Sequence, residues 1–540
     1  MNGAMLIVGN EHREDDSVSN RASTRLGLAA TLAATTALVL VAGPAKADDY
    51  TDLLSVLRDR GNLSQGEYSN LLARHTHGAR TPAGRRAQAS SLRRNAGEGS
   101  SEDAAAAAQQ AAASAAASAA AAQASMQQAR TMMESPEVAR AMPYTPGKGM
   151  TIRVGQIDLN FSGFINAYYT YSSAGHSTNS VIGGGLTDNS GFDSSAIRSG
   201  LLPAALIFKA STTQAGIDLA AVFGIYPGIN SSNTTPLNAN SGGNPVALAT
   251  PGIDFRQIYV TAGTKTAGTV KFGRDLGIFG SDAILSDATL LSVGATGSNA
   301  NPGNTSLGRI GFGYIYADFM PQVSYASPIW GGFQATVGVF QPLDEFNFSG
   351  YSDTANQHNV PMFQGKVTYD YKFGAVAGRA WVSGLYQQQQ NITGTGIVNR
   401  QLTRQATAGD IGIKADIGPV GLVGYYYRGT GVGTTALFFD GIGLNGKTRD
   451  SEGFYAQLSY KITPKLKLVG SYGESSLYLT RGERANVNVV ARNEAEIAAG
   501  YYSVTDWLTL VGEYAHTHSR SHGTGSTDAN AFTGGGIIFF

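Results

Sequence analysis

The sequence predicts an all-β transmembrane barrel of about sixteen antiparallel strands, with an N-terminal α-helical extension. Three observations lead to this prediction. Apolar and polar residues alternate along successive segments from residue 151 onward, short connections alternate with long ones, and the last segment is an apolar strand that ends on Phe540. Such alternation is typical of strands with one face toward lipid and the other toward a lumen.

The start of the chain has the pattern of a secretory signal peptide. Arg21 and Arg25 precede an apolar run at 26–42, and small residues lead to Ala47. We expect cleavage after Ala47, which assigns residues 1–47 to the signal peptide. A membrane anchor is the alternative, but the run is short, rich in alanine and threonine, and followed by two aspartates.

Residues 48–150 are predicted to form a separate extension in the periplasm. A first short helix ends at Gly61, and Ser64 with Glu67 has the spacing of a capping box that begins a second helix. Residues 104–129 are almost entirely alanine, glutamine and serine. Because alanine favours helix but supplies no large apolar core, this segment is either a close-packed bundle such as a trimeric coiled coil or a helical spacer.

Between these helices, residues 74–94 are basic and interrupted by glycine, proline and serine. This composition is typical of a solvated linker. Contact with an anionic envelope polymer, such as peptidoglycan, is the alternative.

The predicted barrel occupies residues 151–540. In its first strand Ile165 and Tyr169 fall on one face, whereas Asn160 and Asn166 fall on the other. The same separation recurs in segments 217–225, 366–373, 411–417 and 454–462. These segments predict strands whose apolar face is directed outward and whose polar face is directed inward.

The connections alternate between short and long. Short turns are expected at 211–215, 263–268, 327–332, 373–375, 418–421, 463–465 and 503–507. Long links rich in glycine, asparagine, serine and threonine are expected at 173–197, 228–252, 281–312, 343–360, 391–402, 434–450, 480–489 and 521–528. Together these links join about sixteen strands, although one missed hairpin would change the number to fourteen or eighteen.

Composition narrows the class of protein. The chain has no cysteine, which excludes disulfides, cysteine-bound metals and thiol catalysis. Its formal net charge is zero, so the bulk charge implies no binding to nucleic acid. A barrel of sixteen strands is too wide to be filled by its own side chains, and we therefore expect an aqueous pore.

Several features resemble Gram-negative outer-membrane porins. The final strand through Phe532, Ile538 and Phe540 resembles the closing strand of those barrels, and the Gly273–Arg274 pair resembles the end of the fifth strand in general porins. The helical extension is similar to that of porins with a periplasmic coiled coil, the DcaP-like group. The resemblance implies a homotrimer in a bilayer that contains lipopolysaccharide, insertion by the barrel-assembly machinery, a third loop folded into the lumen, and passage of small anionic solutes.

If the third loop folds inward, its carboxylates should narrow the pore together with bases on the wall. The expected loop residues are Asp275, Asp282 and Asp287. The expected basic wall consists of Lys209, Arg256, Lys271, Arg274, Lys366, Arg379, Lys414, Arg428 and Lys461, with Arg274 placed outward by strict alternation. Carboxylates that face bases create a transverse field that filters polar solutes. Since acids are also expected in the lumen, no ion selectivity is predicted.

Two other classes of function remain open. A structural or adhesive barrel could anchor the cell wall through its extension. A barrel enzyme is less favoured: His516 and His518 lie close to serines, but alternation places both histidines on the lipid or rim side. We therefore predict a porin that uses no catalytic residue, metal or cofactor.

Overall fold

The structure is a computed structural model that describes residues 101–134, 138–175, 182–230, 253–300, 302–303, 305–394, 402–483 and 487–540. The predicted signal peptide, the two short helices and the basic linker lie outside these ranges. Helix α5 (Ser101–Glu134) contains the alanine-rich segment, as its composition predicts. None of the described helices is long and apolar enough to cross a membrane.

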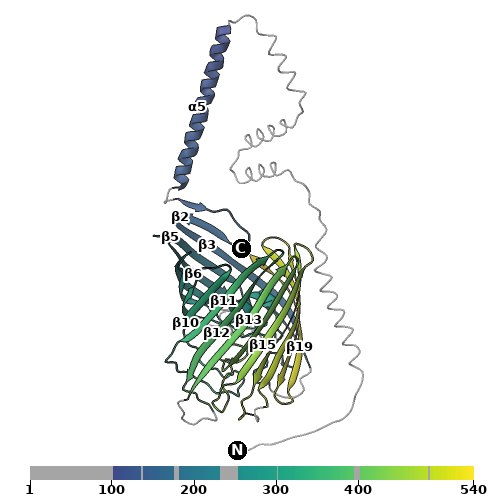
Figure 1. The fold of residues 1–540 in the computed structure, drawn as a ribbon. Coiled ribbons are helices and arrows are strands. Elements are labelled where there is room, and N and C mark those ends of the chain that lie inside the picture. Colours follow the sequence, from purple (N-terminus) through teal and green to yellow (C-terminus); the bar gives the residue numbers. More distant parts are fainter. Residues whose placement is uncertain are drawn as a thin grey trace, which may run out of the picture. The chain divides into compact units, whose positions relative to one another are not determined.

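The remaining described chain forms a closed antiparallel β-barrel (Figure 1). Sixteen strands, β3 and β5 to β19, pair in sequence order, and β19 returns to β3. The strands are β3 (Ile157–Ala174), β5 (Ala205–Gln214), β6 (Ile217–Pro227), β7 (Ile253–Thr264), β8 (Gly268–Leu276), β9 (Phe319–Ala326), β10 (Phe333–Phe340), β11 (Met362–Phe373), β12 (Val376–Gln390), β13 (Thr403–Ile417), β14 (Val420–Thr430), β15 (Asp450–Lys461), β16 (Leu466–Tyr478), β17 (Val490–Ser503), β18 (Leu508–Ser521) and β19 (Ser526–Phe539).

Three short strands add to the first barrel strand. Strand β2 (Met150–Val154) pairs with the first residues of β3, and β1 (Ala139–Ala141) pairs with β2. Strand β4 (Ser194–Arg198) pairs with the second half of β3. The predicted fold class is confirmed, including the number of barrel strands.

The last strand closes the barrel as predicted. In the ladder between β19 and β3, Phe532 is opposite Tyr171, and Ile538 is opposite Ile165. Phe540 continues this pairing, because its N–H donates to the carbonyl of Gly163 at 3.0 Å and its carbonyl accepts from the Gly163 N–H at 2.9 Å. A Cβ atom at Gly163 would lie 2.7 Å from the Phe540 ring, so only glycine allows this close approach.

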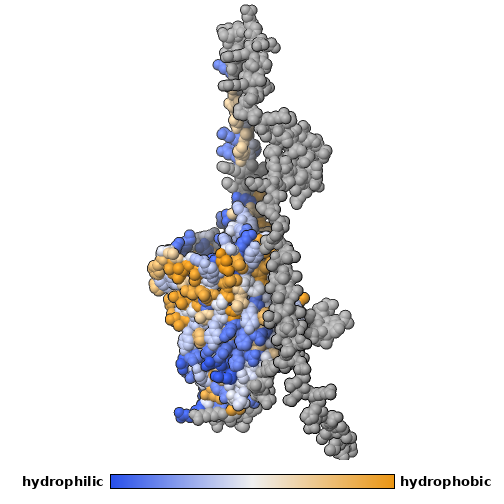
Figure 2. All heavy atoms as spheres, turned by 90° about the vertical axis from the view of Figure 1, so that its right-hand side faces the viewer, coloured by the Kyte–Doolittle hydropathy of each residue, from blue (hydrophilic) through white to orange (hydrophobic). Residues whose placement is uncertain are grey.

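The two faces of the wall separate apolar and polar residues. Ile165, Ile411 and Leu458 are exposed on the outer face, whereas Asn166 and Thr170 are buried inside. Figure 2 shows apolar residues gathered over one part of the barrel wall and hydrophilic residues over another. The predicted direction of the alternation is therefore correct, because an outer wall facing lipid should be apolar.

Each of the seven predicted short turns overlaps a turn between consecutive strands, although most of the predicted 211–215 belongs to β5. The first is a two-residue turn in which Ala215 and Gly216 both have positive φ, the geometry that suits tight hairpins. At the other end of the strands, the link of 277–318 extends beyond the predicted 281–312 at both ends. This link is the third of the long loops, and it holds α6 (Ser281–Ser286) and the 3₁₀ helix η2 (Ala288–Leu291).

Candidate functional site

The segment 277–318, called the inner loop below, lies inside the barrel. It follows β8, the fifth barrel strand, as the sequence predicts. Phe279, Ala283 and Tyr314 of the inner loop are completely buried, and they share one apolar cluster with Trp381 and Tyr425 of the barrel wall. A loop exposed to solvent would not bury these side chains, so apolar packing fixes the inner loop against the wall.

Hydrogen bonds from inward-facing wall residues hold the inner loop along its length. The Gly280 N–H donates to Asp410 Oδ2 at 3.0 Å, which fixes the start of α6. The N–H groups of Ile278, Ala288 and Gly294 donate to Gln364 on β11, Gln457 on β15 and Glu513 on β18, respectively. The hydroxyl of Tyr501 on β17 donates to the Ala288 carbonyl. Because these partners belong to five strands distributed from β11 to β18, the inner loop crosses the interior of the barrel.

Asp282 in the first turn of α6 binds two wall bases. Its Oδ2 lies 2.5 Å from Lys366 Nζ, and its Oδ1 lies 3.2 Å from Arg379 Nη1. Arg379 also makes a two-pronged contact with Asp370 at 2.6 and 2.8 Å. The structure thus brings together a predicted loop carboxylate and two predicted wall bases, but as direct ion pairs rather than as charges across a water column.

Asp287 does not face water, so its prediction as a carboxylate of the water column is wrong. Its side chain is fully buried, and its carboxylate accepts from Tyr314 Oη at 2.9 Å and from the Thr289 N–H at 3.0 Å. Arg309 of the same loop lies 3.9 Å away and is equally buried. The motif Asp-x-Thr at 287–289 caps η2, and this local structural role explains the burial.

Asp275 belongs to the wall, at the end of β8, rather than to the inner loop. It pairs with Lys271 four residues earlier and accepts a hydrogen bond of 2.9 Å from Gln257. Arg256 beside Gln257 lies over the rings of Tyr226 and Phe319, at 5.4 and 6.0 Å from their centroids. These residues form a second polar group on the wall, next to the beginning of the inner loop.

The other predicted wall bases fall into two groups. Lys209, Lys414 and Lys461 are exposed residues on the lumen face of β5, β13 and β15. Arg428 instead shares the outer face of β14 with Tyr426, and its side chain is 63% exposed and lies 3.5 Å from Glu452. The prediction that Arg428 lines the lumen is therefore wrong, because the buried Tyr427 next to it takes the inward position.

Arg274 lies on the outward face that strict alternation predicts, and not on the lumen face expected for the basic wall. It is exposed on the face of Phe272, and its Nη1 donates to the Phe319 carbonyl at 2.6 Å. Its guanidinium thus binds a backbone carbonyl rather than the carboxylates of Asp282 or Asp287. His516 likewise shares the face of Tyr514, and its ring contacts Asn530 at 3.0 Å, as expected for a residue of the outer rim.

A cavity of about 940 Å³ lies beside the inner loop. Lys271, Asp275 and Lys366 line it from the wall, and Ser281 and Leu285 line it from the inner loop. The inner loop therefore forms part of the wall of this cavity.

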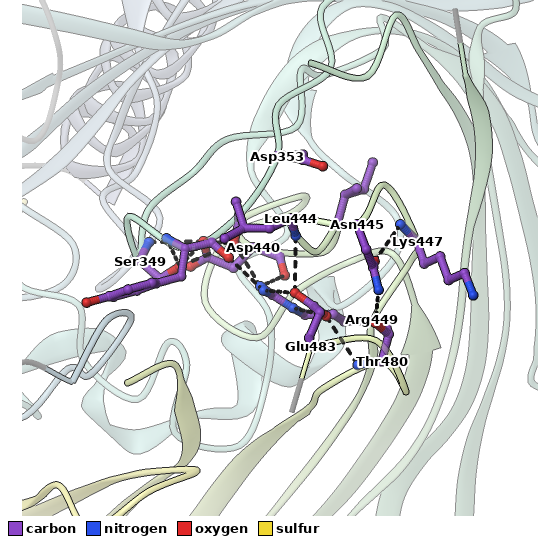
Figure 3. A network of polar contacts seen from close by, with 12 residues as sticks. Ser349, Asp353, Asp440, Leu444, Asn445, Lys447, Arg449, Thr480 and Glu483 are labelled. Carbon is purple, nitrogen blue, oxygen red and sulfur yellow. Dashed lines mark hydrogen bonds and ion pairs between the residues drawn. The ribbon is translucent and has the colours of Figure 1, made fainter. Parts of the chain in front are cut away.

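Three other long loops are joined by a buried polar network, which we call the loop network (Figure 3). Arg449 of 431–449 donates to Glu483 of 479–489 at 2.6 and 3.1 Å, and both side chains are at most 1% exposed. Arg449 also donates to the hydroxyl of Ser352 in 341–361 at 2.7 Å. Figure 3 shows Arg449 directed toward Glu483, with Asp440 and Ser349 alongside. The loop network ties these loops into one unit.

Two carboxyl groups in these loops have shifted proton affinities. Burial raises the pKa of Glu345 well above its usual value, more than the hydrogen bond from the Ile442 N–H lowers it. For Glu483, burial alone would raise the pKa, but the hydrogen bonds and the charge of Arg449 hold it below its usual value. The folded loops therefore favour the protonated form of Glu345 and the ionised form of Glu483.

Sequence reasoning missed the residues that anchor the inner loop. Glu513 is one of the acids that alternation places in the lumen, and Asp410 falls on the predicted inward face of its segment, but neither was expected to bind the inner loop. Both residues accept hydrogen bonds from backbone N–H groups of the inner loop. No pattern in the sequence shows which loop atoms approach which wall residue. Arg449 and Glu483 were missed because they come from different loops.

A sixteen-stranded antiparallel barrel with an inner loop after the fifth strand defines a class of outer-membrane channel proteins. The family model for Gram-negative porins matches residues 105–522. The chain belongs to the Gram-negative porin family, and it is an outer-membrane porin.

Solved outer-membrane proteins are similar to this chain at low sequence identity. The outer-membrane channel DcaP of Acinetobacter baumannii is 15% identical with a TM-score of 0.55, and the match covers 72% of this chain and 99% of DcaP. The anion-selective porin of Comamonas acidovorans is 13% identical with a TM-score of 0.45, covering 71% of this chain and 100% of that chain. OmpF of Salmonella typhi, solved with daunomycin, is 12% identical with a TM-score of 0.43, covering 73% and 100%. No curated protein matches the sequence.

Proposed function

We propose that this porin lets small hydrophilic solutes and ions diffuse passively through a water-filled lumen that the inner loop narrows. The observation that carries the proposal is the burial of the inner loop inside a sixteen-stranded barrel, with a cavity of about 940 Å³ left open beside it. The constriction should be static, because apolar packing and hydrogen bonds with residues of five strands hold the inner loop against the wall.

The charges at the constriction favour sorting by size and local field over strong ion selectivity. Asp282 and Asp370 together neutralise Lys366 and Arg379 at short range. Exposed lumen lysines such as Lys414 coexist with inward acids, so the lumen carries both signs of charge. A solute therefore meets a polar water column without one dominant charge.

Assembly and attachment belong to the same proposal. The barrel would insert through the barrel-assembly machinery into a bilayer with lipopolysaccharide and form a homotrimer. Residues 48–150 would extend into the periplasm and could contact peptidoglycan. The helix α5 supports a rod-like extension, because alanine stabilises helix over its whole length. Removing residues 48–150 should leave the barrel folded if the extension is a separate unit.

Single-channel recording of the purified protein in planar bilayers tests the channel function. We expect stepwise openings with a linear relation between current and voltage. A barrel that is folded on a gel yet gives no current steps would contradict the proposal.

A further inference from the structure

The cavity beside the inner loop has a large apolar share in its lining, next to polar and charged residues. Leu285, Leu290, Leu343 and Leu437 line it, together with Phe348 and Phe439. A cavity of about 940 Å³ lies at the upper end of the size range of small-molecule sites, and such sites are mostly apolar with a few polar groups. The lining therefore offers an apolar surface beside polar groups, as binding sites for small molecules do.

Leu285 is the clearest departure from a simple sieve. It belongs to α6, whose other apolar residues Ala283 and Ile284 are buried against the wall. Its own side chain is 60% exposed and lines the cavity. An exposed leucine gains free energy when another apolar surface covers it.

Aromatic residues extend the apolar lining into the long loops. Phe346 and Phe348 are 52% and 42% exposed. Their ring centroids lie 4.9 and 5.5 Å from that of Phe439 in another loop. Phe348 and Phe439 also line the cavity, so they share its wall with Leu285. Contiguous exposed apolar surface of this kind marks ligand-binding grooves.

Charges of both signs border the cavity. Lys271 is paired with Asp275, and Lys366 with Asp282. Arg256 lies over the rings of Tyr226 and Phe319, and Arg274 donates to the Phe319 carbonyl. Because the carboxylates of Asp275, Asp318 and Asp344 also line the cavity, an anionic ligand would meet acids as well as bases. An uncharged ring, by contrast, can stack on the exposed phenylalanines and cover Leu285 without removing any ion from its partner.

We propose that the cavity is a binding site for uncharged small solutes that combine an aromatic ring with polar groups. The ring would contact Leu285, Phe348 and Phe439, and the polar groups would remain in the water of the lumen. This inference rests on the proposed channel function, since the solute reaches the site through the pore.

The test compares two neutral glucosides that differ in their apolar group. Phenyl β-D-glucoside and methyl β-D-glucoside are added in turn to single channels in a planar bilayer, and the concentration dependence of the current noise gives the dissociation constant. We expect noise from reversible binding with the phenyl compound and little with the methyl compound. Leu285→Ser and Phe348→Ser should each weaken binding of the phenyl compound by about tenfold, the effect of losing much of one buried apolar side chain.

Phe192→Ser is the matched control. Phe192 is an exposed aromatic of the first long loop, 59% exposed, and it is not part of the cavity lining. This variant should bind the phenyl compound as the original channel does. Linear current steps in every variant show that the barrel has folded.

Equal noise from the two glucosides would overturn the inference, as would unchanged binding in both Leu285→Ser and Phe348→Ser. Either result would leave the channel function intact, because the current steps are measured in the same experiment. Absence of current steps without any glucoside would instead contradict the proposed channel function.

Discussion

Replacing Asp282 by asparagine should make the channel more permeable to anions relative to cations. Asp282 binds Lys366 and Arg379, and Arg379 also binds Asp370. These four side chains carry two positive and two negative charges, which sum to zero. With asparagine at position 282, the sum becomes one positive charge at the edge of the lumen.

The size of this effect follows from simple electrostatics. An ion that passes about 7 Å from one uncompensated charge gains or loses about 0.6 kcal/mol in water, and screening at 0.1 M salt reduces this to about 0.3 kcal/mol. The charge favours anions and disfavours cations by the same amount. The ratio of anion to cation permeability should therefore rise by about threefold.

The assay is the reversal potential of single channels across a gradient of potassium chloride. The double variant Asp282→Asn with Lys366→Gln is the matched control, because it restores a sum of zero and should return the permeability ratio to its original value. An unchanged ratio in Asp282→Asn, or the same ratio in the single and the double variant, would refute the electrostatic reasoning.

Three further predictions concern assembly and the long loops. Deleting Phe540 removes two backbone hydrogen bonds to Gly163 and should lower the yield of folded barrel in membranes several-fold, measured by heat-modifiable migration on gels. Arg449→Met leaves Glu483 buried without its partner, so limited proteolysis of the long loops should accelerate, consistent with a local cost of about 3–5 kcal/mol. Because the pKa of Glu345 is raised, its contribution to loop stability is complete at low pH and declines as the pH rises through that pKa; proteolysis should therefore accelerate at high pH, but not in Glu345→Gln.

Each of these predictions has a control or a contrary result. Channels that fold without Phe540 should conduct normally, and altered conductance with normal yield would contradict the assembly role. Arg428→Met, at an exposed pair, should change proteolysis little. Equal proteolysis in Arg449→Met and Arg428→Met would argue against the loop network. For Glu345, a pH dependence that persists in Glu345→Gln would assign the titration to another group.

The barrel could be predicted from the sequence because its signals are local and repeated. Strand faces follow from alternation, and glycine-rich turns such as Ala215–Gly216 end the strands. Closure of the barrel follows from the apolar last strand that ends on Phe540. These features depend on neighbours along the chain, so one sequence is sufficient.

The site was only partly predictable because contacts between distant segments decide it. Lys366 and Arg379 were placed on the correct face, but their pairing with Asp282 depends on the path of the inner loop. Asp287 was misplaced because a carboxylate in a loop can cap a helix as readily as it can face water. For Arg428, counting alternate residues failed because its inward neighbour Tyr427 is aromatic and was not recognised as a lumen residue.

The single-channel conductance of a variant that lacks residues 283–306 tests the central claim most directly. These residues include the buried Ala283 and Ile284 of α6 and the segment that reaches β18. If the inner loop narrows the pore, the folded variant should conduct more current per channel than the complete protein at the same voltage. An unchanged conductance in a folded barrel would contradict the account.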